Sequence, residues 1–90
     1  MKPVRWTRHA LANLTDCGSN REEAERALIE PEFVASAGPN RRVAMRRYTD
    51  EDLRQQMLLL IVVEDTPAEE VVITAYKTSN IRRYLKGVTS

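Results

Sequence analysis

Two arginines and a tyrosine share one face of a predicted strand near the middle of the chain. Residues 41–48 read RRVAMRRY, and side chains alternate between the two faces of a β-strand, so Arg42, Arg46 and Tyr48 point the same way. The planar guanidinium of arginine matches the geometry of phosphate oxygens. The row therefore suits contact with a phosphate backbone, or else forms a solvated sheet face whose arginines discourage edge pairing.

A second group of reactive side chains follows the last apolar stretch of the chain. Residues 70–76 predict a strand, and Lys77 comes directly after it. Arg82, Arg83 and Tyr84 lie in the basic tail that follows, where a phenol can stack on a base or move a proton. The alternatives are that Lys77 is a surface lysine and that Tyr84 pins the tail to the core.

The single histidine is the remaining candidate for proton transfer. His9 lies in a predicted helix beside the apolar stripe, and histidine is the side-chain type whose charge changes near neutral pH. Its alternative role is that of a half-buried helix residue bonded to a nearby carbonyl or carboxylate. Trp6 and Cys17 are expected to be apolar packing residues.

Together these residue types suit cleavage of RNA without a metal ion. A base removes the proton of the 2′-hydroxyl, cations stabilise the charge that develops at phosphorus, and an acid protonates the leaving 5′-oxygen. The candidates for catalysis are His9, Arg46, Lys77 and Tyr84, and those for RNA binding are Arg42, Arg46, Tyr48, Arg82 and Arg83.

Composition predicts one globular domain over residues 1–90, since 42% of the residues are hydrophobic and 30% are charged. The net charge of +1 conceals separate acidic and basic stretches, which permits an RNA partner without requiring one. One cysteine and one histidine exclude an intramolecular disulfide and a multi-cysteine zinc site, so we expect no metal and no cofactor. With no signal peptide and no long apolar run, we expect a cytoplasmic protein that does not contact a membrane.

The elements that carry these residues can be read from periodicity and turn signals. Residues 8–16 and about 20–29 predict two helices, the second ended by Pro31. Strands are expected at 32–36, 41–48, 56–64 and 70–76, and residues 2–6 are expected to be extended. The expected fold class is α+β, with two N-terminal helices on one face of a four-stranded, mainly antiparallel sheet and a short C-terminal helix or tail.

The order of these elements and several local phrases resemble the RelE/ParE-like toxin superfamily, closest to BrnT-type toxins and related small bacterial proteins. The phrases are His9 to Leu14, Arg21 to Ala24, Glu30-Pro31, Arg41 to Val43, the strand 58–63, and Ile73 to Lys77. The resemblance implies an endoribonuclease surface on the sheet face opposite the helices, with a basic residue at Lys77. It also implies a cognate antitoxin protein as partner, with RNA as the substrate.

Two functions from different classes follow. One is the toxin component of a type II toxin–antitoxin system, acting on mRNA as a metal-independent endoribonuclease. The other is a non-catalytic module of the same fold that binds or regulates a partner. A further alternative is a ParE-like toxin that acts on a target other than RNA. If the strand at 32–36 lies at a sheet edge, it could also pair two copies of the chain as a homodimer.

Overall fold

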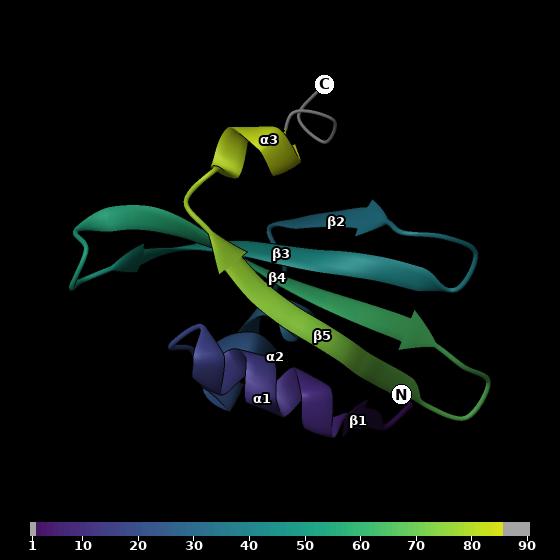
Figure 1. Ribbon diagram of the computed structural model, residues 1–90. Coiled ribbons are helices and arrows are strands. Elements are labelled where there is room, and N and C mark those ends of the chain that lie inside the picture. Colours follow the sequence, from purple (N-terminus) through teal and green to yellow (C-terminus); the bar gives the residue numbers. More distant parts are fainter. Residues whose placement is uncertain (1, 86–90) are drawn as a thin grey trace.

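A computed structural model describes the backbone of residues 2–85 and the side chains of residues 2–83. Its fold is α+β, as expected, with a single sheet between helices (Figure 1). The strands are β1 (Val4–Trp6), β2 (Phe33–Ser36), β3 (Arg41–Asp50), β4 (Gln55–Asp65) and β5 (Glu70–Thr78). The helices are α1 (Arg8–Asp16), α2 (Arg21–Ile29) and α3 (Ile81–Leu85).

The sheet has five strands in the order β1-β5-β4-β3-β2, and the prediction of four mainly antiparallel strands is wrong in this respect. The four expected strands do pair antiparallel with their neighbours in sequence. The additional strand is β1, which pairs in parallel with β5 through Val4 and Glu70, Arg5 and Val71, and Trp6 and Val72. The N-terminal stretch was expected only to be extended, because its partner lies more than sixty residues away and leaves no local signal.

Both N-terminal helices begin at the predicted positions because side chains cap them. The hydroxyl of Thr7 accepts the N–H of Ala10 at the start of α1, and Asn20 accepts the N–H of Glu23 at the start of α2. Gly18, in the left-handed conformation at φ 71°, ends α1 and permits the tight turn into α2.

The two helices cover one face of the sheet, with α1 against β5 and α2 against β3 and β4 (Figure 1). The helices contribute small residues to this core, and the strands contribute the larger ones. The buried residues are Ala10, Leu14, Ala24, Ala27, Ala44, Leu59, Ile61, Val63, Val72 and Ala75. Helices whose contact residues are alanines can approach a sheet closely, so this layer is thin and tightly packed.

The opposite face carries a smaller core that α3 covers (Figure 1). Met45, Leu58 and Leu60 are buried there, and Ile81 of α3 packs against them together with Phe33. The central strand β4 is therefore buried on both faces, as its unbroken apolar run predicts. No helix in the described part of the chain is long and apolar enough to cross a membrane.

The distal ends of β3 and β4 extend beyond their other neighbours. Pairing of β2 with β3 ends at Met45, and pairing of β5 with β4 ends at Leu58, whereas β3 and β4 remain paired out to Asp50 and Gln55. Residues 47–57 thus form a two-stranded arm, with Leu53 exposed at its tip. The base of this arm forms one wall of the candidate site.

Truncation of the core on the helical side provides the first test of this fold. Ile61→Ala is expected to lower the free energy of unfolding by about 2–5 kcal/mol, because the side chain is fully buried between β4 and the helices. The matched control is Ile29→Ala, which removes the same atoms from a side chain that is 77% exposed and should change stability by about 0.5 kcal/mol or less. Urea denaturation followed by circular dichroism measures both, and equal losses would contradict the packing described here.

Candidate functional site

A groove runs between the turn that joins α1 to α2 and the base of the arm. It consists of two adjoining hollows of about 300 Å³ and 310 Å³. The first is lined by Glu23, Arg26, Arg46, Tyr48, Thr49 and Leu59, and the second by Gly18, Glu23, Tyr48, Thr49, Asp50, Glu51 and Lys77. Because Glu23, Tyr48 and Thr49 line both hollows, the two adjoin and form one site, the groove.

The cations of the groove differ from most others in the described chain because none of them forms an ion pair, although Glu23, Asp50 and Glu51 also line the groove. Ion pairs elsewhere engage Lys2 with Asp65, Arg5 with Glu69, Arg21 with Glu25, Arg41 with Glu64, Arg42 with Glu70, and Arg47 with Glu32. Within the described residues, Arg26, Arg46 and Lys77 form no such pair. Arg46 donates one hydrogen bond, from Nη1 to the carbonyl oxygen of Glu30 at 2.6 Å, and its remaining N–H groups are available to an anion.

Lys77 and Tyr48 form the inner wall of the second hollow. The Nζ atom of Lys77 lies 5.4 Å from the centroid of the Tyr48 ring, a cation–π distance. The turn at Gly18 lies beside the same ammonium group, since a Cβ atom at position 18 would be in ordinary van der Waals contact with Nζ at 3.6 Å. The turn and the ring together hold Lys77 at the groove.

The ionisable groups of this wall keep their protons at neutral pH. Burial raises the pKa of Tyr48, although the neighbouring Lys77 ammonium opposes that shift. Burial alone would lower the pKa of Lys77, but its interactions with Tyr48 and the charges of Cys17 and Asp50 outweigh this effect, and its pKa is raised. Lys77 is therefore a lasting positive charge at the groove, and Tyr48 is a neutral phenol.

The groove brings together three of the residues predicted from the sequence, namely Arg46, Tyr48 and Lys77. Arg46 and Tyr48 share a face with Arg42, as the alternation predicts, because these residues pair with Leu59, Met57 and Val63 of β4. The resemblance implied a ribonuclease surface on the sheet face opposite the helices, but this row lies on the other face. The row faces α1 and α2, since Tyr48 packs on the core that those helices cover.

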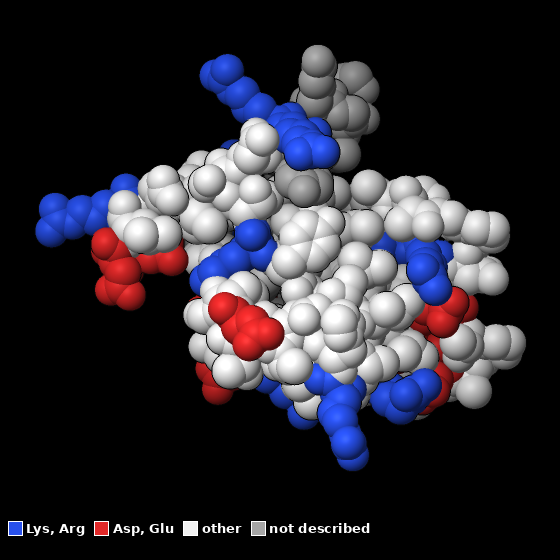
Figure 2. Space-filling model, in the orientation of Figure 1, with Lys and Arg blue, Asp and Glu red and all other residues white. Residues whose placement is uncertain are grey.

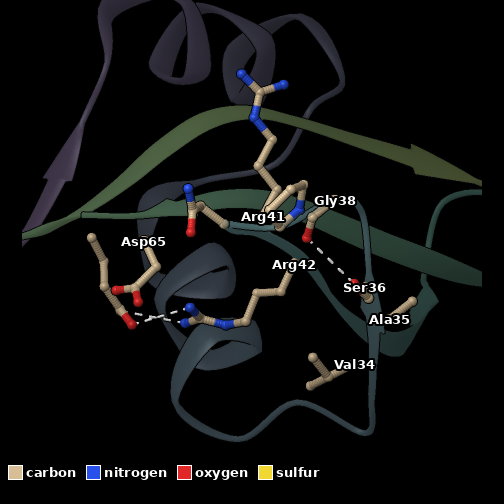
Figure 3. Close-up of a pocket in the computed structure, with 10 residues that line it drawn as sticks. Val34, Ala35, Ser36, Gly38, Arg41, Arg42 and Asp65 are labelled. Atoms are coloured by element: carbon tan, nitrogen blue, oxygen red, sulfur yellow. Dashed lines mark hydrogen bonds and ion pairs between the residues drawn. The ribbon is translucent and has the colours of Figure 1, made fainter. Parts of the chain in front are cut away.

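Arg42 lies at the other end of this row, four residues and about 13 Å along β3 from Arg46. Its guanidinium donates to both carboxylate oxygens of Glu70, at 3.1 and 3.3 Å, above a separate hollow of about 360 Å³ (Figure 3). Since a bidentate pair of this kind is among the stronger polar contacts in proteins, a phosphate would have to displace Glu70 to bind here. Arg42 is thus better explained as a structural link between β3 and β5.

The other predicted residues lie outside the groove. His9 is exposed in the first turn of α1, and the helical rise of about 1.5 Å per residue places it roughly 12 Å from the end of α1 that adjoins the groove. Arg82 and Arg83 are exposed on α3, beyond the opposite face of the sheet. The side chain of Tyr84 lies outside the described residues.

The charges on the face shown in Figure 2 do not form one continuous basic strip. Figure 2 shows lysines and arginines in separate groups on the face in view, with acidic side chains between several of them. A long nucleic acid could not follow such a surface without meeting carboxylates. These separate groups of cations suit contact with a few phosphates at one site better than contact with a long nucleic acid along the surface.

Glu23 and Arg26 are two of the charged groove residues that sequence reasoning did not nominate as site residues, and Asp50 and Glu51 are the others. Glu23 and Arg26 lie on α2 and are exposed, so in the sequence they look like ordinary solvated helix positions. Their spacing of three residues places them on one side of a helix. This spacing indicates a site only once the opposite wall of the groove, formed by the base of the arm, is known.

Comparison of the chain with protein-family models, with curated proteins and with solved structures finds no match. The described residues also contain no group of three or more histidine, cysteine, aspartate or glutamate side chains placed to hold a metal ion.

The Tyr48 hydroxyl provides a test of the groove wall. Its oxygen is buried and has no partner in hydrogen-bond geometry, although the Lys77 ammonium lies close enough to affect its pKa. We expect Tyr48→Phe to raise the free energy of unfolding by about 1 kcal/mol, because an unpaired buried hydroxyl is removed while the ring remains. Tyr48→Ala, which also removes the ring, should instead lower it by about 3 kcal/mol or more.

Thermal denaturation monitored by circular dichroism measures both changes, and a gain of 1 kcal/mol corresponds to roughly 4–8 °C in Tm for a domain of this size. A lower Tm for Tyr48→Phe than for the native chain would show that the hydroxyl has a hydrogen-bond partner and that the wall is arranged differently.

Proposed function

We propose that this chain is the toxin component of a type II toxin–antitoxin system and cleaves mRNA without a metal ion, at the groove. The observation that carries the proposal is the convergence of Arg26, Arg46 and Lys77 in one concave site without carboxylate partners. Three cations gathered in one site repel one another, and because none of them is held in an ion pair they remain available to an anionic ligand.

The division of the groove suggests a role for each cation. Arg26 and Arg46 line the first hollow and are the groups suited to hold the non-bridging oxygens of a phosphate. Lys77 lines the second hollow and would stabilise the negative charge that develops as the 5′-oxygen leaves. Tyr48 stands between the two hollows and acts as a positioning residue, because its ring holds the Lys77 ammonium.

The proposed toxin role rests on the resemblance to the RelE/ParE-like superfamily and to BrnT-type toxins. It places the protein in the cytoplasm, with its mRNA substrate and a cognate antitoxin. An acidic antitoxin segment would suit the unpaired cations of the groove as well as RNA does, and would block access to them.

A second function, that of a non-catalytic module that binds a partner, is favoured by one observation. His9, the only histidine, lies outside the groove, so the residue type best suited to proton transfer near neutrality is missing there. The same groove would then bind a phosphate or carboxylate group of its partner without cleaving it.

Growth arrest after induced expression in a bacterial host tests the toxin proposal. We expect the native chain to arrest growth, and Arg46→Ala and Lys77→Ala to relieve the arrest, because each removes a charge from the groove. Arg8→Ala is the matched control, since Arg8 is an exposed arginine of α1 that does not line the groove. Immunoblotting must show equal abundance of all four proteins.

Cleavage by the purified chain identifies the target. A labelled RNA incubated with excess chelator should yield a 2′,3′-cyclic phosphate and a 5′-hydroxyl, with the rate reduced roughly 100-fold by Lys77→Ala. A 2′-deoxy substitution at the cleaved position should abolish the reaction. Arrest without RNA cleavage would favour a ParE-like target, and no arrest by a folded native chain would leave the non-catalytic module as the better account.

A further inference from the structure

The proposed reaction requires a proton acceptor, and most polar groups of the groove cannot serve. Arginine keeps its proton at all accessible pH values, and the pKa of Lys77 and that of Tyr48 are both raised. His9 lies at the far end of α1. Among the residues that line the groove, the remaining proton acceptors are the carboxylates of Glu23, Asp50 and Glu51.

Two of these carboxylates are poorly placed. One oxygen of Asp50 accepts the backbone N–H groups of Asp52 and Leu53, both at 3.0 Å, and so shapes the tip of the arm. Glu51 lies in the turn at that tip, is exposed, and lines one of the two hollows but not the one with Arg26 and Arg46.

Glu23 stands where the two hollows meet and lines both. Its backbone N–H is bound by the Asn20 side chain at 2.9 Å, which fixes the first turn of α2. The Ser19 hydroxyl donates to its Oε2 atom at 2.7 Å, which leaves Oε1 available. The side chain is exposed and lies three residues before Arg26, which lines the same hollow, so the two residues lie on one side of α2.

We propose that Glu23 is the general base of the groove and removes the 2′-hydroxyl proton of the RNA. This inference rests on the proposed ribonuclease function. The 2′-oxygen then attacks the adjacent phosphorus, whose bond to the 5′-oxygen breaks to give a 2′,3′-cyclic phosphate. Lys77 donates a proton to the leaving oxygen, which becomes a 5′-hydroxyl, and the proton on Glu23 returns to Lys77 through water, so both side chains regain their starting forms.

The test compares Glu23→Gln with the native chain. Glutamine keeps the size of the side chain and can still accept from Ser19, but it cannot take up a proton. Glu22→Gln is the matched control, because Glu22 is exposed in the same first turn of α2 and does not line the groove. Circular dichroism verifies that all three proteins are folded.

Two quantities are measured for each protein: the single-turnover cleavage rate of a labelled RNA, and the Kd for the same RNA made uncleavable by 2′-O-methylation. We expect Glu23→Gln to lower the rate at least 100-fold while the Kd changes less than threefold, and Glu22→Gln to match the native chain in both. Glu23→Asp should recover part of the rate.

The outcomes separate this inference from the proposed function. If the native chain cleaves RNA and Glu23→Gln cleaves it within threefold of the native rate, the role of Glu23 is overturned while the ribonuclease proposal stands. If the Kd weakens as much as the rate, Glu23 organises the groove and is not the base. A native chain that binds RNA and does not cleave it overturns both proposals.

Discussion

The structure depends on the need to bury both faces of β4. Leu58 and Leu60 point to one side of the sheet, and Leu59 and Ile61 point to the other, and all four are buried. A strand that is apolar on both faces cannot lie at a solvated surface, so each side must be covered. The helices α1 and α2 provide one layer, and α3 provides the other with Ile81.

The groove forms where the first of these layers ends. On β3, Ala44 is fully covered by the helices, whereas Arg46 and Tyr48 continue the same face beyond that cover. The strand must remain paired with β4, yet the short helices cannot extend over the arm. The polar side chains at this border therefore meet the turn between α1 and α2, and the concave site is a consequence of the mismatch in length between strands and helices.

Local features of the structure could be predicted from sequence, and features that depend on distant contacts could not. Alternation identified which side chains of β3 share a face, and Thr7, Asn20 and Gly18 marked the helix ends through interactions within a few residues. Two features depend on which distant segments of the chain meet: the sheet face that α1 and α2 cover, and the parallel pairing of β1 with β5. A local pattern of residues carries no information about such contacts. Glu23 lies in the first turn of α2, and its position in the groove depends on Tyr48, which belongs to another layer.

The contacts of α1 and β1 also bear on the order in which the groove forms during folding. The helix α1 packs on β5, and β1 pairs with the same strand, so both elements find their partner far along the chain. Closing a loop of this length carries an entropic cost before any contact is formed. We expect β1 and α1 to be the last segments protected from hydrogen exchange during refolding, so that the helix turn beside Lys77 completes the groove late in folding.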